Sequence, residues 1–171
     1  TDGRVTGVLT TGGEVLQTAK VLSTAGLPET QGLAGLPVAA RFGRVAFLET
    51  ANVFRELPGH DETIVFFCNT ERLVYRRPET AVDLNSGILC YPHNFKLEEG
   101  DFIPPPMIKT SVLANPERFP AERASAVNAV NELTARLTGA NLADAVFSDS
   151  CTPYTVERYT GRGGGAIYGS P

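Results

Sequence analysis

Long apolar segments are missing from this sequence. The main apolar runs, TIVFFC at residues 63–68 and SGILCY at 86–91, are far shorter than the roughly 20 residues that a helix needs to cross a bilayer. The first residues, TDGRVTG, are polar and hold no apolar stretch of the kind found in a secretory signal. The sequence therefore predicts neither a membrane-spanning helix nor a cleaved signal in these residues.

An excess of basic residues is missing too. Lysine and arginine together number 15 against 19 aspartate and glutamate residues, which gives a formal net charge of -4. Proteins that bind nucleic acid or an anionic membrane surface usually carry a basic patch. The charge balance therefore predicts no nucleic-acid partner.

Cysteine is scarce, with only Cys68, Cys90 and Cys151 in the chain. An odd and sparse set fits free thiols in a reducing compartment better than a disulfide framework. Cys68 and Cys90 stand inside apolar, strand-like runs, so we expect them to be buried and to behave as small hydrophobic residues.

Complete catalytic or metal-binding motifs are also lacking. Cys90 and His93 have C-x-x-H spacing, but Cys68, Cys151 and His60 show no paired spacing, so no metal site is predicted. There is no G-x-S-x-G motif, and Cys151 could meet a histidine only through the fold. The residues alone therefore name no catalytic group.

Strand patterns are abundant in what remains. Two apolar segments, 4–10 and 13–17, flank the turn signal TTGG and predict a hairpin. A short strand is expected at 21–24. A connector is expected at 27–38, with room for one helical turn. The segment 70–85 is expected to be an exposed excursion. Further strands, the compact apolar ones buried, are expected at 45–54, 62–69, 86–91, 107–115 and 142–151.

Two helices are expected. The long one has Pro120 in its first turn and ends at Gly139, and the short one has Thr152 as its cap and ends at Gly161. The apolar stripe of the long helix is formed by Ala124, Val127, Val130, Leu133 or Thr134, and Leu137. The predicted class is α+β, with a mixed, largely antiparallel sheet and the long helix packed on one face.

The chain ends on a glycine-rich stretch, GRGGGAIYGSP. Gly161, Gly163 and Ala166 match the spacing G-x-G-x-x-A of a dinucleotide loop. Such a loop must follow a strand and open a helix, whereas these glycines follow a helix end. Two interpretations stay open: a helix C-cap with a closely packed loop, or bare backbone that lies against a flat ligand.

Two segments resemble one family when they are taken together. They are DGRVTGVLTTGGEVLQTAKVLSTAG at 2–26 and TPYTVERYTGRGGGAIYGSP at 152–171, and LANPERF at 113–119 adds a looser likeness. They are similar to segments of the phytoene dehydrogenase and carotenoid isomerase branch of the FAD-dependent oxidoreductases.

The resemblance implies an FAD enzyme that desaturates, saturates or isomerises a long, apolar, carotenoid-like isoprenoid. Ala25 and Gly26 match the small residues that pass near the cofactor in this family. Gly165, Ala166 and Tyr168 match the stretch that reaches the flavin ring and the inner end of the substrate pocket, although Tyr168 could equally be a packed core aromatic. The resemblance names no catalytic residue.

The resemblance also implies a domain division. The family's Gly-rich βαβ unit and its G-D strand have no counterpart in this sequence, so we expect a fragment with an incomplete FAD site and no activity of its own. Residues 1–30 would form an edge of the flavin domain, 31–160 the substrate-binding domain, and 161–171 a return segment. We further expect a cytoplasmic parent enzyme, with membrane-surface contact left open, and self-association of the fragment through uncovered apolar surface.

Two other functions stay open. One is a non-enzymatic domain that uses its sheet face to bind an apolar ligand or another protein. The other is a flavin enzyme of the amine oxidase type, because the lining of a substrate pocket cannot be read from this sequence.

Overall fold

The computed structural model describes residues 3–37, 45–96, 98, 100 and 102–166. Contacts within the chain divide it into two compact units, Thr1–Ala39 and Ala40–Pro171. Each unit is described by itself below.

The first unit contains the predicted hairpin. Strands β1 (Gly7–Leu9) and β2 (Val15–Gln17) pair antiparallel, which confirms the hairpin around TTGG. The strand predicted at 21–24 is wrong, because the Ser23 hydroxyl instead lies 2.6 Å from the Thr30 hydroxyl and Leu22 is 93% exposed. Thr30 belongs to helix α1 (Leu27–Leu33), which occupies the expected connector.

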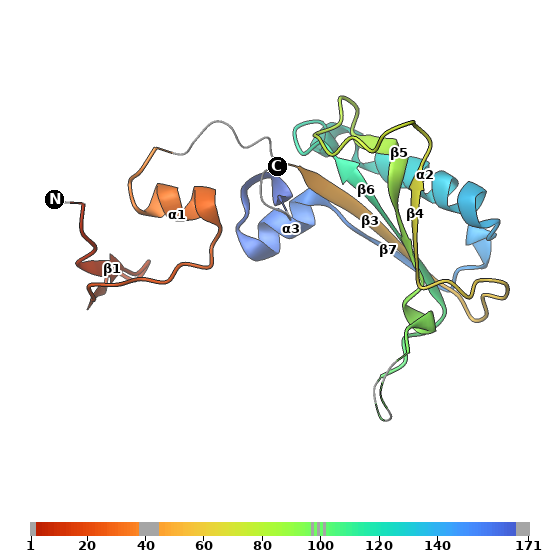
Figure 1. The fold of residues 1–171 in the computed structure, drawn as a ribbon, viewed down its shortest axis with the longest axis horizontal. Helices are drawn as coiled ribbons and strands as arrows, with labels where there is room; N and C mark the ends of the chain where they lie inside the picture. Colours follow the sequence, from red (N-terminus) through yellow and green to blue (C-terminus); the bar gives the residue numbers. More distant parts are fainter. Residues whose placement is uncertain (1–2, 38–44, 97, 99, 101, 167–171) are drawn as a thin grey trace. The chain divides into compact units, whose positions relative to one another are not determined.

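The second unit is built on a five-stranded sheet in the order β4-β5-β6-β3-β7 (Figure 1). Every neighbouring pair in it is antiparallel. The strands are β3 (Ala46–Val53), β4 (Ile64–Cys68), β5 (Val82–Cys90), β6 (Met107–Ala114) and β7 (Phe147–Cys151). A strand is therefore confirmed within each of the five predicted segments of this region. The segment 142–151 is a strand only from Phe147, because Leu142–Asp144 forms a 3-10 turn.

Strand β5 begins earlier than expected. The structure starts it at Val82, whereas the sequence pattern placed residues up to 85 in an exposed excursion. Val82 pairs with Ala114 and Gly87 pairs with Val112, so β5 carries extra residues in a bulge opposite β6. The bulge interrupts the alternation of side chains, so the sequence pattern does not predict the first part of the strand.

Helix α2 (Phe119–Thr138) lies along one face of the sheet (Figure 1). Gly139 ends it with a φ of 71°, as the sequence predicted. Its buried side chains include Val130, Leu133 and Thr134, but Ala124 is exposed and Leu137 is 37% exposed. Val127 also packs against the core, so the middle of the predicted stripe is confirmed, whereas Ala126 is buried where Ala124 was expected. The Thr134 hydroxyl is buried in a 2.7 Å hydrogen bond with Thr110 of β6.

Two apolar clusters form the core. One packs α2 against the sheet, and its buried members include Leu48, Val112 and Val130. The other contains Ile108 and Tyr91, together with Phe54 and Leu89. Both lie on the α2 side, so this side of the sheet is the one filled by the chain itself.

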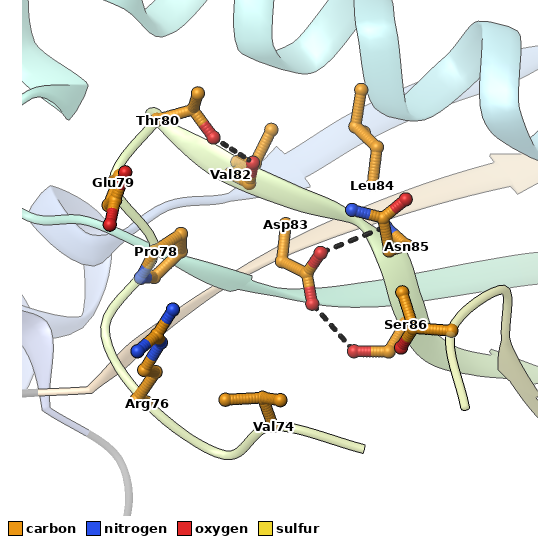
Figure 2. A pocket seen from close by; sticks show the side chains of 11 residues that line it. Val74, Arg76, Pro78, Glu79, Thr80, Val82, Asp83, Leu84, Asn85 and Ser86 are labelled. Carbon is orange, nitrogen blue, oxygen red and sulfur yellow. Dashed lines mark hydrogen bonds between the residues drawn. The ribbon is translucent and has the colours of Figure 1, made fainter. Parts of the chain in front are cut away.

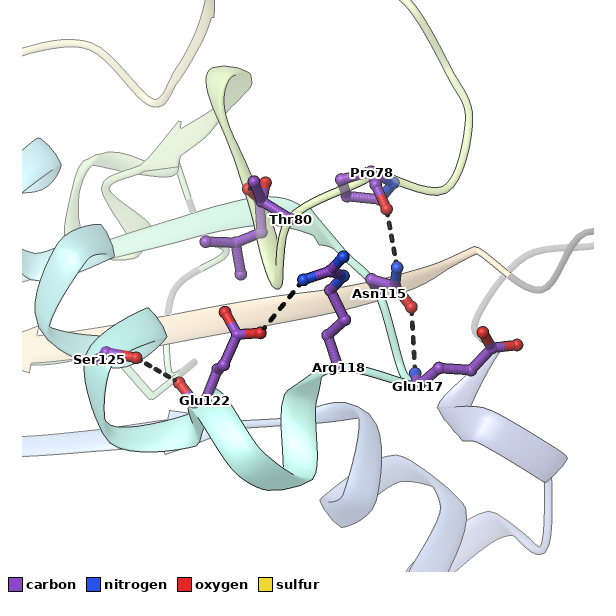
Figure 3. A network of polar contacts seen from close by, with 8 residues as sticks. Pro78, Thr80, Asn115, Glu117, Arg118, Glu122 and Ser125 are labelled. Carbon is purple, nitrogen blue, oxygen red and sulfur yellow. Dashed lines mark hydrogen bonds and ion pairs between the residues drawn. The ribbon is translucent and has the colours of Figure 1, made fainter.

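Polar contacts fix the junction between β6 and α2 (Figure 3). The side-chain amide nitrogen of Asn115 donates to the Pro78 carbonyl at 2.8 Å. The side-chain oxygen of Asn115 accepts from the backbone amide of Glu117 at 3.1 Å. Arg118 pairs with Glu122 at 3.6 Å. Asn115, which belongs to the LANPERF segment, thus ties the start of α2 to the segment before β5.

Helix α3 (Pro153–Thr160) confirms the predicted short helix. Thr152 and Thr155 exchange the hydrogen bonds of a capping box, and Gly161 ends the helix with a φ of 70°. A 3-10 turn, η3 (Gly163–Gly165), follows directly.

Candidate functional site

The five-stranded sheet has a second face, opposite α2. Thr110 and Asn52 point toward α2, since they bond Thr134 at 2.7 Å and Asn131 at 3.2 Å. Their neighbours along each strand must therefore point the other way. We call this surface the open face. Its residues are Ile64, Phe66 and Cys68 of β4, Ile88 and Cys90 of β5, Met107, Lys109, Ser111 and Leu113 of β6, Phe47, Glu49, Ala51 and Val53 of β3, and Phe147, Asp149 and Cys151 of β7. Leu113 is only 6% exposed, so the open face is covered at the Phe47–Leu113 pair.

The strand register arranges the open face in rows that cross the sheet. One row runs Phe66, Ile88, Ser111, Glu49, Cys151. The next runs Ile64, Cys90, Lys109, Ala51, Asp149. In these two rows, apolar side chains and Cys90 lie over β4 and β5, and polar groups gather over β6 and β3. A third row, Met107, Val53, Phe147, is apolar.

An ion pair lies at the centre of the open face. Lys109 Nζ is 2.7 Å from Glu49 Oε1, and both side chains are 34% exposed. The Ser111 hydroxyl donates to the other carboxylate oxygen, Glu49 Oε2, at 2.9 Å. We call these three residues the polar cluster.

The cysteine on each side of the polar cluster is poorly suited to be a nucleophile. Desolvation raises the pKa of the Cys90 thiol, and the Glu49 charge raises it further while Lys109 lowers it. Desolvation likewise raises the pKa of Cys151, with Glu49 acting in the same direction. A thiol is nucleophilic as the thiolate, and these surroundings disfavour that form.

The expected burial of Cys68 is wrong. All three cysteines are free, but Cys68 and Cys151 are exposed and Cys90 is half-buried. The reason is that Cys68 lies on the edge strand β4 and points to the open face. The same position leaves Phe66 76% exposed, so β4 is not the buried strand that its apolar run predicts.

Gly165 and Ala166, two of the predicted cofactor residues, lie beside α3 and β3. Gly165 is buried with a φ of 65°, and a Cβ there would collide with the Pro153 carbonyl in the first turn of α3. Ala166 forms an isolated antiparallel bridge with Ala46, the first residue of β3. The structure thus gives the glycine a packing reason that needs no ligand. Tyr168 lies outside the described residues.

Ala25 and Gly26, the other predicted cofactor residues, belong to the first unit. Ala25 is exposed, and Gly26 precedes α1 with a φ of 99°. A Cβ on Gly26 would stand 2.7 Å from a carboxylate oxygen of Glu29. This conformation explains the glycine locally, and a role near a cofactor stays a prediction for both residues.

A cavity of about 450 Å³ lies between the segment before β5 and the bulge of β5 (Figure 2). Its central carboxylate, Asp83, accepts hydrogen bonds from the Asn85 amide at 2.9 Å and from the Ser86 hydroxyl at 2.6 Å. These bonds hold the bulge in shape. The carboxylate therefore has a structural role, and the cavity is a weaker candidate site than the open face.

Cys90 and His93, the two residues of the C-x-x-H spacing, make different contacts. Cys90 points to the open face, whereas Tyr91 points to the core and stacks on His60 with ring centroids 5.1 Å apart. His93 Nδ1 accepts a hydrogen bond from the Met107 amide at 3.2 Å. Burial lowers the pKa of His93, and the nearby His60 lowers it further. No group of three or more His, Cys, Asp or Glu within the described residues could hold a metal ion.

Sequence reasoning missed the polar cluster. Glu49 and Lys109 stand in the middle of apolar strands, where alternation already places them on the face opposite the buried residues. The alternation within each strand therefore already indicates on which face its charged residue lies. Their contact depends on β3 lying beside β6, which the sequence pattern does not reveal.

No protein-family model, no curated protein and no solved structure matches this chain significantly. In the part of the chain that the structure describes, no helix combines the length and the apolar character needed to cross a membrane.

Proposed function

We propose that this chain supplies the substrate-binding sheet of an FAD-dependent oxidoreductase similar to phytoene dehydrogenases, and that an apolar isoprenoid lies on the open face. The observation that carries the proposal is the contrast between the two faces of one sheet. One face is packed by α2, while the other is rich in apolar side chains, and none of the described helices of the second unit lies along it (Figure 1).

The edge strand β4 shows why the open face favours an apolar ligand. Its run IVFFC is apolar on both sides, although only Val65 and Phe67 pack toward the core. Phe66 and Ile64 are 76% and 45% exposed. Fully burying a large apolar side chain contributes about 1.5–3 kcal/mol, so covering these two residues would favour binding substantially.

The flavin part of the proposal rests on the sequence resemblance. The glycine run follows the end of α3 and opens only the 3-10 turn η3, so it offers a pyrophosphate no helix N-terminus. The glycine run therefore does not fit the FAD pyrophosphate. Flavin would supply the redox chemistry, and this chain would bind and orient the apolar substrate.

The complete natural protein tests this proposal. We expect it to purify yellow, to release FAD on denaturation, and to lose its flavin absorbance when a suitable isoprenoid is added without oxygen. A colourless protein that still binds isoprenoids would support the non-enzymatic alternative. A flavoprotein reduced by amines and not by isoprenoids would support the amine oxidase alternative.

Cytoplasmic location and self-association belong to the same proposal. Light scattering on this chain tests the second, because an uncovered apolar face favours association between copies. A strictly monomeric chain at high concentration would contradict it.

A further inference from the structure

We propose that the polar cluster selects isoprenoids that end in a neutral hydroxyl group, with the hydroxyl held at Lys109 and Glu49 and the apolar chain lying toward β4. This inference rests on the proposed function of the open face and specifies its substrate class. It begins from an ion pair placed at the centre of a surface that an apolar ligand would cover.

An ion pair is costly in such a place. Covering it removes water from both charges, and a pair of apolar residues of similar size would often be as stable or more stable there. A purely hydrocarbon ligand would therefore gain from apolar residues at positions 49 and 109. Their charges are better explained by a ligand that carries its own polar group.

The cluster offers hydrogen-bonding capacity beyond its internal bonds. An ammonium group has three donors, and Lys109 uses one on Glu49. A carboxylate has about four acceptor positions, and Glu49 receives Lys109 on Oε1 and Ser111 on Oε2. A hydroxyl can accept from the ammonium and donate to the carboxylate, so it complements both groups at once.

Charge favours a neutral group over an anion. The Lys109–Glu49 pair has no net charge, and Asp149 lies in the same row of the open face as Lys109. A carboxylate or diphosphate ligand would meet two acidic side chains for one basic one. A neutral alcohol meets no such repulsion.

In this proposal, the apolar chain lies along the row that leads to β4. Ile88 and Phe66 continue the row of Ser111 and Glu49 across β5 to the edge strand β4. Strands are spaced about 4.8 Å apart, so β4 lies about 10 Å from β6. A ligand with a hydroxyl at one end and an apolar chain longer than about 10 Å matches this arrangement.

Displacement of the neutral dye Nile red tests the inference on this chain. The two competitors are farnesol and farnesene, which share a C15 isoprenoid chain and differ mainly in the hydroxyl. The readout is the ratio of their dissociation constants, compared between the natural chain and the double variant Glu49→Leu with Lys109→Met. We expect the preference for farnesol to fall about tenfold in the double variant, the effect of losing a hydrogen bond to charged groups.

Two further double variants serve as controls for this test. Arg77→Met with Glu117→Leu removes another ion pair, 2.6 Å long in the structure and away from the open face, and should leave the ratio unchanged. The double variant Glu49→Ala with Lys109→Ala is used if the Leu and Met pair does not fold. It removes the same polar groups and should lower the ratio in the same way.

The outcomes separate the two proposals. A ratio that is the same in the natural chain and in the cluster variants would overturn the hydroxyl inference and leave an isoprenoid-binding open face standing. Failure of both competitors to displace the dye would overturn the open face as an isoprenoid site, and the hydroxyl inference with it. An equal fall in the control pair would also contradict the inference.

Discussion

The two faces of the five-stranded sheet solve the problem of polar groups in different ways. Toward α2, the buried polar side chains are neutral, and the hydroxyls of Thr110 and Thr134 satisfy one another at 2.7 Å. The open face instead carries charged side chains, and those of Lys109 and Glu49 are a third exposed. The chain thus buries only neutral polar groups toward α2, one of which, the Thr50 hydroxyl, has no hydrogen-bond partner among the described residues, and it keeps charges on the face where water leaves only if something binds.

The largest expected difference between the faces concerns apolar side chains. Ile108 is fully buried on the α2 side, so Ile108→Ala should lower the free energy of unfolding by about 2–5 kcal/mol. Phe66→Ala on the open face should change it by less than about 0.5 kcal/mol, because Phe66 is 76% exposed. Urea unfolding followed by circular dichroism measures both. Equal losses would mean that the open face is covered in solution.

The ion pair should show a smaller effect. Lys109→Met alone leaves Glu49 half-buried without its cation, and we expect a loss of about 1 kcal/mol in unfolding free energy. The double variant Glu49→Leu with Lys109→Met should recover that loss, since it removes both charges. If the double variant is less stable than the single one, the pair has a structural role that this comparison of faces does not describe.

A modest effect of pH is expected where the sheet meets η1 (Pro92–Asn94). The pKa of His93 in the folded chain is below its usual value near 6.5, chiefly through burial and then through His60. The unfolded chain therefore binds a proton more readily, so this contribution to stability is complete above about pH 6.5 and is lost as the pH falls through the folded pKa.

Urea unfolding between pH 7.5 and 5 checks this dependence, with His93→Gln as the matched variant. We expect the variant to lose less stability than the natural chain over this interval. Parallel curves for the two proteins would contradict the assignment to His93.

The smallest expected difference concerns the thiols of the open face. Cys90 and Cys151 should react with iodoacetamide at pH 8 several-fold more slowly than Cys68, because desolvation raises the pKa of both thiols and lowers their thiolate fraction. Lys109→Met should slow Cys90 further, since Lys109 lowers its pKa. Mass spectrometry of each cysteine peptide gives the rates, and in urea the three rates should converge.

Local signals in the sequence predicted most of the elements. Pro120 and Gly139 bracket α2, Thr152 and Gly161 bracket α3, and TTGG marks the hairpin, because each of these residues acts within its own turn. The β5 bulge and the absent strand at 21–24 could not be predicted in this way. They depend on whether a segment finds a partner strand, which no single segment encodes.

The candidate site was harder to predict for the same reason. Glu49 and Lys109 are far apart in sequence and meet only because β3 inserts between β6 and β7. The glycine-rich end showed the opposite problem. Its glycine spacing resembles that of a ligand-binding loop. In the structure, however, Gly161 ends helix α3, and Gly165 leaves space for the backbone of Pro153.

The central place of β3 has a consequence for how this sheet forms. β3 is the first strand of the sheet along the chain, but its partners are β6 and β7, the last two. Neither of its ladders can close until Met107–Ala114 or Phe147–Cys151 has been synthesised and has found it. Pairings between strands that are distant in sequence slow folding. During synthesis, we therefore expect β3 to stay unpaired, with its apolar side chains exposed, after β4 and β5 have already paired.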